Sequence, residues 1–402
     1  MRLTPVVRGL TLAAALLPPA AAALLAQSDT WALTNARIQT VTKGVIDKGT
    51  ILIRKGLIET VGPAVTIPAD ARVIDLSGKT VSPGLIDLTS SLGLAAPAAG
   101  GGGQGGGAQA APSGPRGLEP DRDVARELKV APADVKPLRD AGIAAVLVAP
   151  SRGLFRGMSA LIPLRDSVDD SEVIRSQVAM HIGYQSVPGD YPGTLLGVIA
   201  YQRQAFFDAQ RQGLILDRYR TNPRGMERPE NDPGLEALVP VVRVVLRGAT
   251  EAWMLADTLA ARKIPIIVGP LTATPDGDAP YDAIYAYPGV LAKAGVQIAF
   301  QTNDGGEGDA RNLPYNAALA TAYGLDPEEA LRAVTINPAR IWGVADRIGS
   351  IEAGKVANLF LTTGDPLDVR SQVREVFIRG QRMPWDDRHT TEYQKFRNRP
   401  KP

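Results

Sequence analysis

The sequence predicts an α/β protein in which a central domain of alternating helices and strands lies between two β-rich ends. Short β-branched runs separated by turn residues fill residues 31–75. Helices and apolar strands then alternate from residue 134 to residue 335, which is typical of parallel strands joined by crossover helices. Strands return after Ile348. The simplest arrangement is therefore a composite β-sandwich made from both ends, beside a barrel made from the middle.

The strands of the two ends are delimited by turn residues. Lys43-Gly44, Lys55-Gly56 and Gly62-Pro63 each follow a short run rich in β-branched residues, and turns at intervals of roughly eight to twelve residues are typical of a small β-sandwich. At the other end of the chain, strands are predicted at residues 358–362 and 373–379. The polar and basic tail after them is expected to lie along the surface without forming an element.

The central elements alternate, with one long irregular interruption. Asp326 is the expected N-cap of the last helix, and the acidic residues Glu328 and Glu329 in its first turn favour the helix dipole. Residues 151–231 have an irregular pattern that predicts no particular element. The other expected elements are helices at residues 134–141, 250–262 and 327–335, a helix ending at 290–294, and strands at 81–87, 142–148, 264–268 and 296–302.

The composition is that of an ordinary globular protein. The 402 residues are 45% hydrophobic and 21% charged, with 44 Lys and Arg against 42 Asp and Glu. A net charge of +2 gives no reason to expect a nucleic acid or an anionic membrane as partner, and 5% aromatic residues offer few platforms for stacking bases. The absence of cysteine excludes disulfides and sulfur-based zinc sites, and His181 and His389 are the two histidines of the chain.

Residues 1–26 have the three-part pattern of a secretory signal peptide. Arg2 and Arg8 form a basic region, an apolar stretch follows, and small residues from Ala20 to Ala26 offer a cleavage site. The alternatives are a buried helix or an uncleaved membrane anchor, but the apolar stretch is too short to span a bilayer and is broken by Pro18-Pro19. We therefore expect a secreted or periplasmic protein that is soluble after cleavage.

Several ordered stretches resemble one known family. They are residues 80–87 (Thr-Val-Ser-Pro-Gly-Leu-Ile-Asp), 327–335, 337–340 (Asn-Pro-Ala-Arg), 343–344, 347–351 and 352–359. Together they are similar to the amidohydrolase superfamily, in its secreted imidazolonepropionase-like branch. The resemblance implies a (β/α)8-type barrel and a composite β-sandwich, with the boundaries 27–82 for the N-terminal part of the sandwich, 83–344 for the barrel including a Gly-rich loop at 93–117, 345–385 for the C-terminal part of the sandwich, and 386–402 for the tail. It also implies a missing βα unit before residue 246, because residues 235–242 run almost directly into the next unit.

The metal-binding positions of that family are altered in this chain. The resemblance places a His-x-His pair at Thr89 and Ser91; residues i and i+2 of a strand point the same way, but a neutral hydroxyl is a poor zinc ligand compared with imidazole. His181 and Asp87 are the weak remaining metal candidates, and the apolar sequence around His181 favours a core histidine.

The family's catalytic aspartate also falls on an altered position. Asn303 occupies its strict register, and Asp304 follows one residue later. A shift of one residue turns a strand side chain to the other face. Asp304 is therefore the candidate catalytic residue only if the chain bulges at this point.

Two hypotheses follow for the function, and a third has little support. The first is a non-catalytic paralogue without a metal cofactor, forming a homo-oligomer or a hetero-oligomer with an active amidohydrolase subunit. The alternative is an active hydrolase of a small-molecule amide, with zinc or another divalent metal held by carboxylates such as Asp87, Asp304 or Glu307. A serine hydrolase using Ser90 or Ser91 with His181 lacks the Gly-x-Ser-x-Gly elbow.

Overall fold

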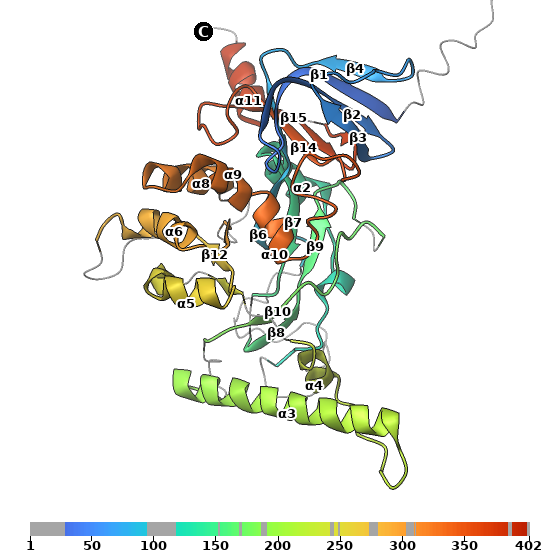
Figure 1. Cartoon of the computed structure of the whole chain (residues 1–402), viewed down its shortest axis with the longest axis vertical. Coiled ribbons are helices and arrows are strands. Elements are labelled where there is room, and N and C mark those ends of the chain that lie inside the picture. Colours follow the sequence, from blue (N-terminus) through green and yellow to red (C-terminus); the bar gives the residue numbers. More distant parts are fainter. Residues whose placement is uncertain are drawn as a thin grey trace, which may run out of the picture.

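The computed structural model describes residues 29–94, 118–151, 153–168, 171–185, 191–241, 245–247, 250–272, 280–302, 309, 311–384 and 388–399. The predicted signal peptide and most of the predicted Gly-rich loop lie outside these residues. An eight-stranded sheet occupies one end of the long axis, the helix–strand part lies in the middle, and one long helix crosses the other end (Figure 1). Among the described residues, no helix is both long and apolar enough to cross a membrane.

Strands from both ends of the chain share the eight-stranded sheet. Its order is β16-β15-β14-β5-β1-β2-β3, with β4 paired to β1. The two ends join where β5 pairs with β14 in antiparallel orientation, and Phe377 packs edge-on against Trp31 with ring centroids 5.8 Å apart. The strands are β1 (Thr30–Gln39), β2 (Val45–Arg54), β3 (Leu57–Gly62), β4 (Arg72–Asp75), β5 (Thr80–Pro83), β14 (Leu359–Thr362), β15 (Val373–Ile378) and β16 (Gln381–Arg382). The inward side chains form a hydrophobic core separate from that of the middle part.

The middle part contains two three-stranded sheets. In one, β6 (Leu85–Ser90) pairs in parallel with β7 (Ile143–Val148), which pairs with β9 (Ala160–Pro163). In the other, β11 (Leu246–Arg247), β12 (Ile266–Val268) and β13 (Ile298–Phe300) are all parallel. The described strands do not close into a ring of eight parallel strands, so a complete (β/α)8 barrel stays a prediction.

Helices cover the middle sheets and fix their positions. Asp326 caps the helix that follows it, as predicted, by accepting hydrogen bonds from the backbone N–H groups of Glu328 and Glu329. In the next helix, the Asn337 side chain donates to the Ile298 carbonyl at 3.0 Å and thereby ties that helix to β13. The helices of this part are α2 (Pro132–Asp140), α5 (Ala256–Ala261), α6 (Ala283–Lys293), α8 (Asn312–Ala322), α9 (Pro327–Ala333) and α10 (Ile336–Ile341), with 3-10 turns η1 (Val124–Arg126) and η2 (Thr250–Leu255).

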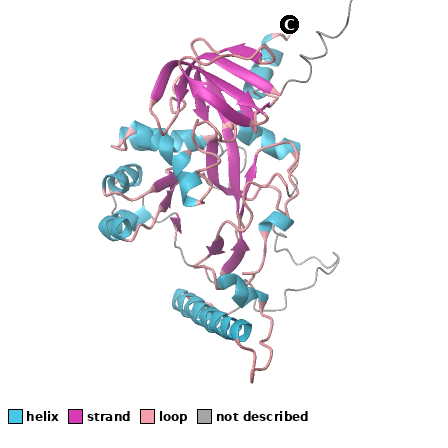
Figure 2. Cartoon of the chain, turned by 45° about the vertical axis from the view of Figure 1, so that its right-hand side comes forward, coloured by secondary structure: helices cyan, strands magenta, loops and turns pink. Residues whose placement is uncertain are grey.

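The segment without a sequence-based assignment contains the longest helix. The strands β8 (Phe155–Met158) and β10 (Met180–Ile182) form a small antiparallel sheet. The 27-residue helix α3 (Leu195–Thr221) and the short α4 (Pro233–Leu238) pack beneath it. Figure 2 shows α3 at the opposite end of the molecule from the eight-stranded sheet.

The tail forms a helix, which corrects the expectation that it would form no element. Helix α11 spans Arg388–Arg397. Its residues from 391 onward are exposed and include the strong helix formers Glu392, Gln394 and Lys395. Because this stretch is mostly polar, no apolar periodicity announces the helix in the sequence.

Candidate functional site

The candidate site lies where β6 and β13 end side by side. Asp87 and Thr89 are two residues apart on β6, and their side chains form hydrogen bonds with the side chains of the consecutive residues Thr302 and Gln301, respectively. Gln301 and Thr302 follow directly after the last residue of β13. Strand ends of this kind carry the active sites of barrel enzymes, because they gather side chains from distant parts of the chain.

Asp87 is a buried carboxylate that is surrounded by donors. Its side chain is 1% exposed. One oxygen accepts hydrogen bonds from the backbone N–H of Thr302 at 3.0 Å and of Thr89 at 3.3 Å, and the other accepts from the Thr302 hydroxyl at 2.5 Å. Burial raises the pKa of Asp87 to about 6, and the hydrogen bonds from Thr302 oppose that rise. Asp87 therefore clasps the end of β13 to β6.

Thr89 begins a second chain of hydrogen bonds across the site. Its hydroxyl lies 2.6 Å from the side-chain oxygen of Gln301 and donates to it. The Gln301 amide donates to the Gly269 carbonyl at 3.0 Å, and the Gly269 N–H donates to the Tyr287 hydroxyl at 3.3 Å. Burial raises the pKa of Tyr287 well above its ordinary value, so this hydroxyl stays neutral. The position expected for a metal ligand is thus part of a network that joins β6, β13, the end of β12 and α6.

These donor groups do not fit a zinc ion. Thr89 offers a hydroxyl and Gln301 an amide oxygen, both already hydrogen-bonded, whereas zinc prefers imidazole, thiolate or carboxylate. The Asp87 oxygens point at Thr302 and the strand backbone. Within the described ranges, no three His, Cys, Asp or Glu side chains converge in a way that could hold a metal ion.

The structure places the other predicted residues in different surroundings. Ser91 is exposed just beyond β6, and the hydroxyl of its buried neighbour Ser90 accepts a hydrogen bond from the Leu92 N–H at 3.0 Å. His181 lies on β10, opposite Gly157 of β8, in a sheet separate from that of Asp87. The catalytic candidate Asp304, its neighbour Asn303, and Glu307 lie outside the described residues.

Three residues of the site were missed in the sequence: Gln301, Thr302 and Tyr287. A signal existed for the first two, because a polar pair directly follows the apolar strand of residues 296–300. Side chains that follow a buried parallel strand lie at the edge where such sites form. Tyr287 gives no comparable signal, since its role depends on packing against Gly269.

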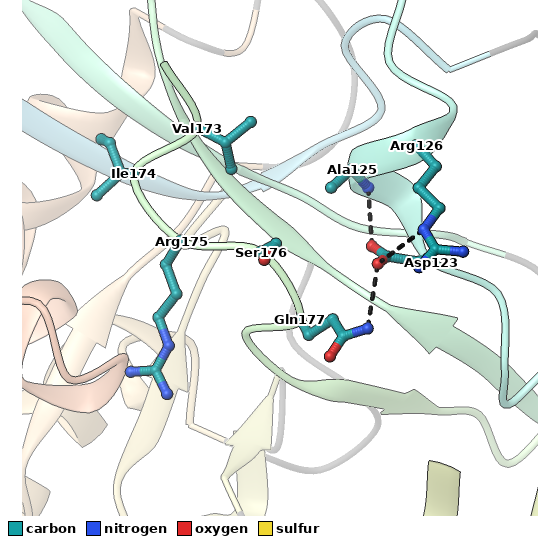
Figure 3. A pocket seen from close by; sticks show the side chains of 8 residues that line it. All are labelled: Asp123, Ala125, Arg126, Val173, Ile174, Arg175, Ser176 and Gln177. Carbon is teal, nitrogen blue, oxygen red and sulfur yellow. Dashed lines mark hydrogen bonds and ion pairs between the residues drawn. The ribbon is translucent and has the colours of Figure 1, made fainter. Parts of the chain in front are cut away.

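A polar groove lies elsewhere, between the η1 turn and the segment after residue 172 (Figure 3). Its volume is about 560 Å³ and its lining includes Asp123, Arg126, Arg175 and Gln177. Asp123 accepts hydrogen bonds from the Ala125 N–H at 3.1 Å and the Gln177 amide at 3.2 Å, so its carboxylate serves to cap η1. Arg175 donates to the Trp342 carbonyl at 2.6 Å. The charged groups of the groove are therefore used to hold segments of the fold together.

Comparison with known proteins gives consistent matches. A family model described as "Amidohydrolase family" matches residues 282–383. An imidazolonepropionase from Shouchella clausii is 44% identical over 73 residues, covering 18% of this chain and 16% of that protein. An N-substituted formamide deformylase from Arthrobacter pascens is 43% identical over 70 residues, covering 17% of this chain and 13% of that protein. The chain thus matches only a small part of the length of these curated relatives.

A solved structure extends the similarity to most of the chain. The amidohydrolase from Thermotoga maritima MSB8 superposes with a TM-score of 0.74 at 26% sequence identity, covering 88% of this chain and 100% of that one. The similarity therefore extends over most of the chain.

Proposed function

Because the chain belongs to the amidohydrolase superfamily and is similar to imidazolonepropionases, we propose that it is a non-catalytic paralogue of C–N bond hydrolases. In this role it keeps the fold without a functional metal centre and acts as a partner subunit of an active amidohydrolase. The N-terminal pattern of residues 1–26 supports secretion or a periplasmic location. A chain can keep the fold and lose the chemistry, because the chemistry depends on a few side chains of the site.

The network at the ends of β6 and β13 carries this proposal. Thr89 stands where the resemblance implies a histidine ligand, and its hydroxyl donates to Gln301 at 2.6 Å. Asp87 uses both oxygens to bind Thr302. Hydroxyl, amide and carboxylate groups that satisfy one another stabilise the strand ends. Among the residues that the structure describes, they leave no preformed set of ligands to lower the pKa of a water molecule.

The irregular middle of the chain also supports the proposal. Two of the parallel strands pair in one sheet and three in another. The long helix α3 and α4 stand between β10 and β11 in chain order. We propose that the barrel is incomplete here, which removes strand ends that supply ligands in a complete barrel.

The alternative is an active hydrolase with a carboxylate-based metal site. The pKa of Asp87, raised to about 6, favours it, because a general acid or base works best near the operating pH. Asp304 and Glu307 would supply further carboxylates, with magnesium, calcium or zinc as the ion.

Hydrolysis and co-purification assays distinguish the two. The purified chain is tested on N-acyl amino acids, dipeptides and cyclic imides with added zinc, magnesium or calcium, alone and after co-expression with a related chain that carries His-x-His. The proposal predicts no turnover by the isolated chain and a stable complex with the related chain. Turnover that is abolished by Asp304→Asn would contradict it and establish the carboxylate site.

A further inference from the structure

Helix α3 presents a long exposed face. Of its 27 residues, the buried ones are Val198, Gln202 and Ala209, which lie on one side of the helix. Leu196 is 79% exposed and Leu214 is 73% exposed, although both are large and apolar. A helix of this length is about 40 Å long at ~1.5 Å per residue. Large apolar side chains that are exposed together with polar ones along such a face mark an interaction surface more often than a solvent-facing one.

Eight of the exposed residues follow the spacing of a coiled-coil seam. Successive members are four and three residues apart, which keeps them on one face of the helix. Phe207, at 50% exposure, and Leu214 lie one heptad apart in the middle of this face. We name this face the α3 seam; its residues, all exposed, are Leu196, Ala200, Arg203, Phe207, Gln210, Leu214, Asp217 and Thr221.

The charges on the α3 seam are arranged symmetrically about Gln210. Arg203 precedes Gln210 by two turns and Asp217 follows it by two turns. The charge of Asp217 has a weak local partner, Arg220 at 3.6 Å, and both side chains are more than 70% exposed. Arg203 lies over the Phe207 ring, 5.4 Å from its centroid. Exposed contacts of this kind contribute little to stability, so both side chains can readily form contacts with a second chain instead.

This symmetry selects one partner and one orientation. Two α3 helices packed in parallel would bring Arg203 against Arg203 and Asp217 against Asp217, which is repulsive. Packed antiparallel about Gln210, Arg203 of each copy faces Asp217 of the other, and Phe207 meets Leu214. We propose that α3 is a self-association surface that binds α3 of a second copy of this chain in antiparallel orientation. This inference does not depend on the absence of catalysis.

Charge exchange tests the orientation. We expect the purified chain to sediment as a dimer at micromolar concentration. Arg203→Asp and Asp217→Arg alone should each raise the dimer dissociation constant by about tenfold or more, because each places like charges together twice. The double variant should restore association. Arg203 and Asp217 are both exposed, so circular dichroism should report the same fold for every variant. A monomeric chain, or a double variant as weak as the single ones, would overturn the proposal.

Cysteine crosslinking gives an independent test, because the chain contains no cysteine. Under mild oxidation, Gln210→Cys should form an intermolecular disulfide across the symmetry axis, where the two Cα atoms approach within disulfide range. Gln204→Cys is the matched control: it is exposed on the same helix, off the α3 seam, and its two copies would be about 18 Å apart along the helices. Equal crosslinking of the two variants, or crosslinking of Leu196→Cys, would exclude antiparallel pairing.

Discussion

The buried carboxyl of Asp87 makes the stability of the fold depend on pH in an unusual direction. An unperturbed aspartate has a pKa of 3.8, and burial raises the pKa of Asp87 to about 6. Between pH 3.8 and about pH 6, the folded chain therefore holds a proton on Asp87, whereas the unfolded chain has released it. At ~1.36 kcal/mol per pKa unit, the difference is about 3 kcal/mol. This contribution is fully present below pH 4 and is lost as the pH rises through 6.

Asp87→Asn isolates this effect. The amide oxygen can accept from the backbone N–H groups of Thr302 and Thr89, and the amide nitrogen can donate to the Thr302 hydroxyl, so the clasp is kept without an ionisable group. We expect the variant and the wild type to be similarly stable near pH 4. At pH 7 the variant should be more stable by up to about 3 kcal/mol.

Denaturant unfolding of both proteins from pH 4 to pH 7.5 measures the difference. Asp368→Asn is the control with the opposite sign, because hydrogen bonds from Arg370 lower the pKa of the exposed Asp368 to about 2. Its contribution is present above pH 4 and is lost as the pH falls through 2, so this variant should not gain stability at pH 7. A difference between wild type and Asp87→Asn that is constant, or that favours the wild type at pH 7, would refute the assignment of the raised pKa.

Three further substitutions test a hydrogen bond of the site and two contacts elsewhere in the fold. Thr302→Val removes the hydroxyl that donates to Asp87 at 2.5 Å and should lower the free energy of unfolding at pH 7 by about 2 kcal/mol; unchanged stability in urea would contradict the clasp. Gly84→Ala would place a Cβ 2.3 Å from the Ala144 Cβ and should cost about 2 kcal/mol or more, whereas Gly193→Ala, with no atom within 4 Å, is the neutral control in the same thermal unfolding assay. Asp166→Ala removes the carboxylate that lies 2.8 Å from the Arg139 guanidinium, whose side chain is 3% exposed. Because the Asp166 side chain is 50% exposed, the free energy of unfolding should fall by only about 1–2 kcal/mol. A smaller loss of stability than that caused by Asp368→Ala would contradict this.

The sequence predicts the elements whose signals are local. The strand expected at 358–362 is Leu359–Thr362, and the helix expected at 327–335 is Pro327–Ala333 with Asp326 as its cap. Both are set by residues next to one another in the chain. Strand limits in the middle part are shorter than expected: β13 is Ile298–Phe300 within the strand expected at 296–302, because its limits are set by pairing with β12.

Elements that depend on distant contacts could not be predicted. The bond from Thr302 to Asp87 joins residues 215 positions apart, and no pattern within either segment specifies it. The sequence gives no clear signal for helix α3, because apolar side chains lie on its exposed face as well as its buried one and no single amphipathic stripe marks it. The altered ligand position at Thr89 was visible in the sequence, but its bond to Gln301 was not.

Zinc binding by the intact purified chain tests the central claim most directly. Titration with zinc, followed by dialysis and elemental analysis, compares the chain with an amidohydrolase that carries His-x-His. Hydroxyl and amide groups at Thr89 and Gln301 should retain no zinc above the buffer background. One or two zinc ions held per chain after dialysis, and lost on Thr89→Val, would contradict the account.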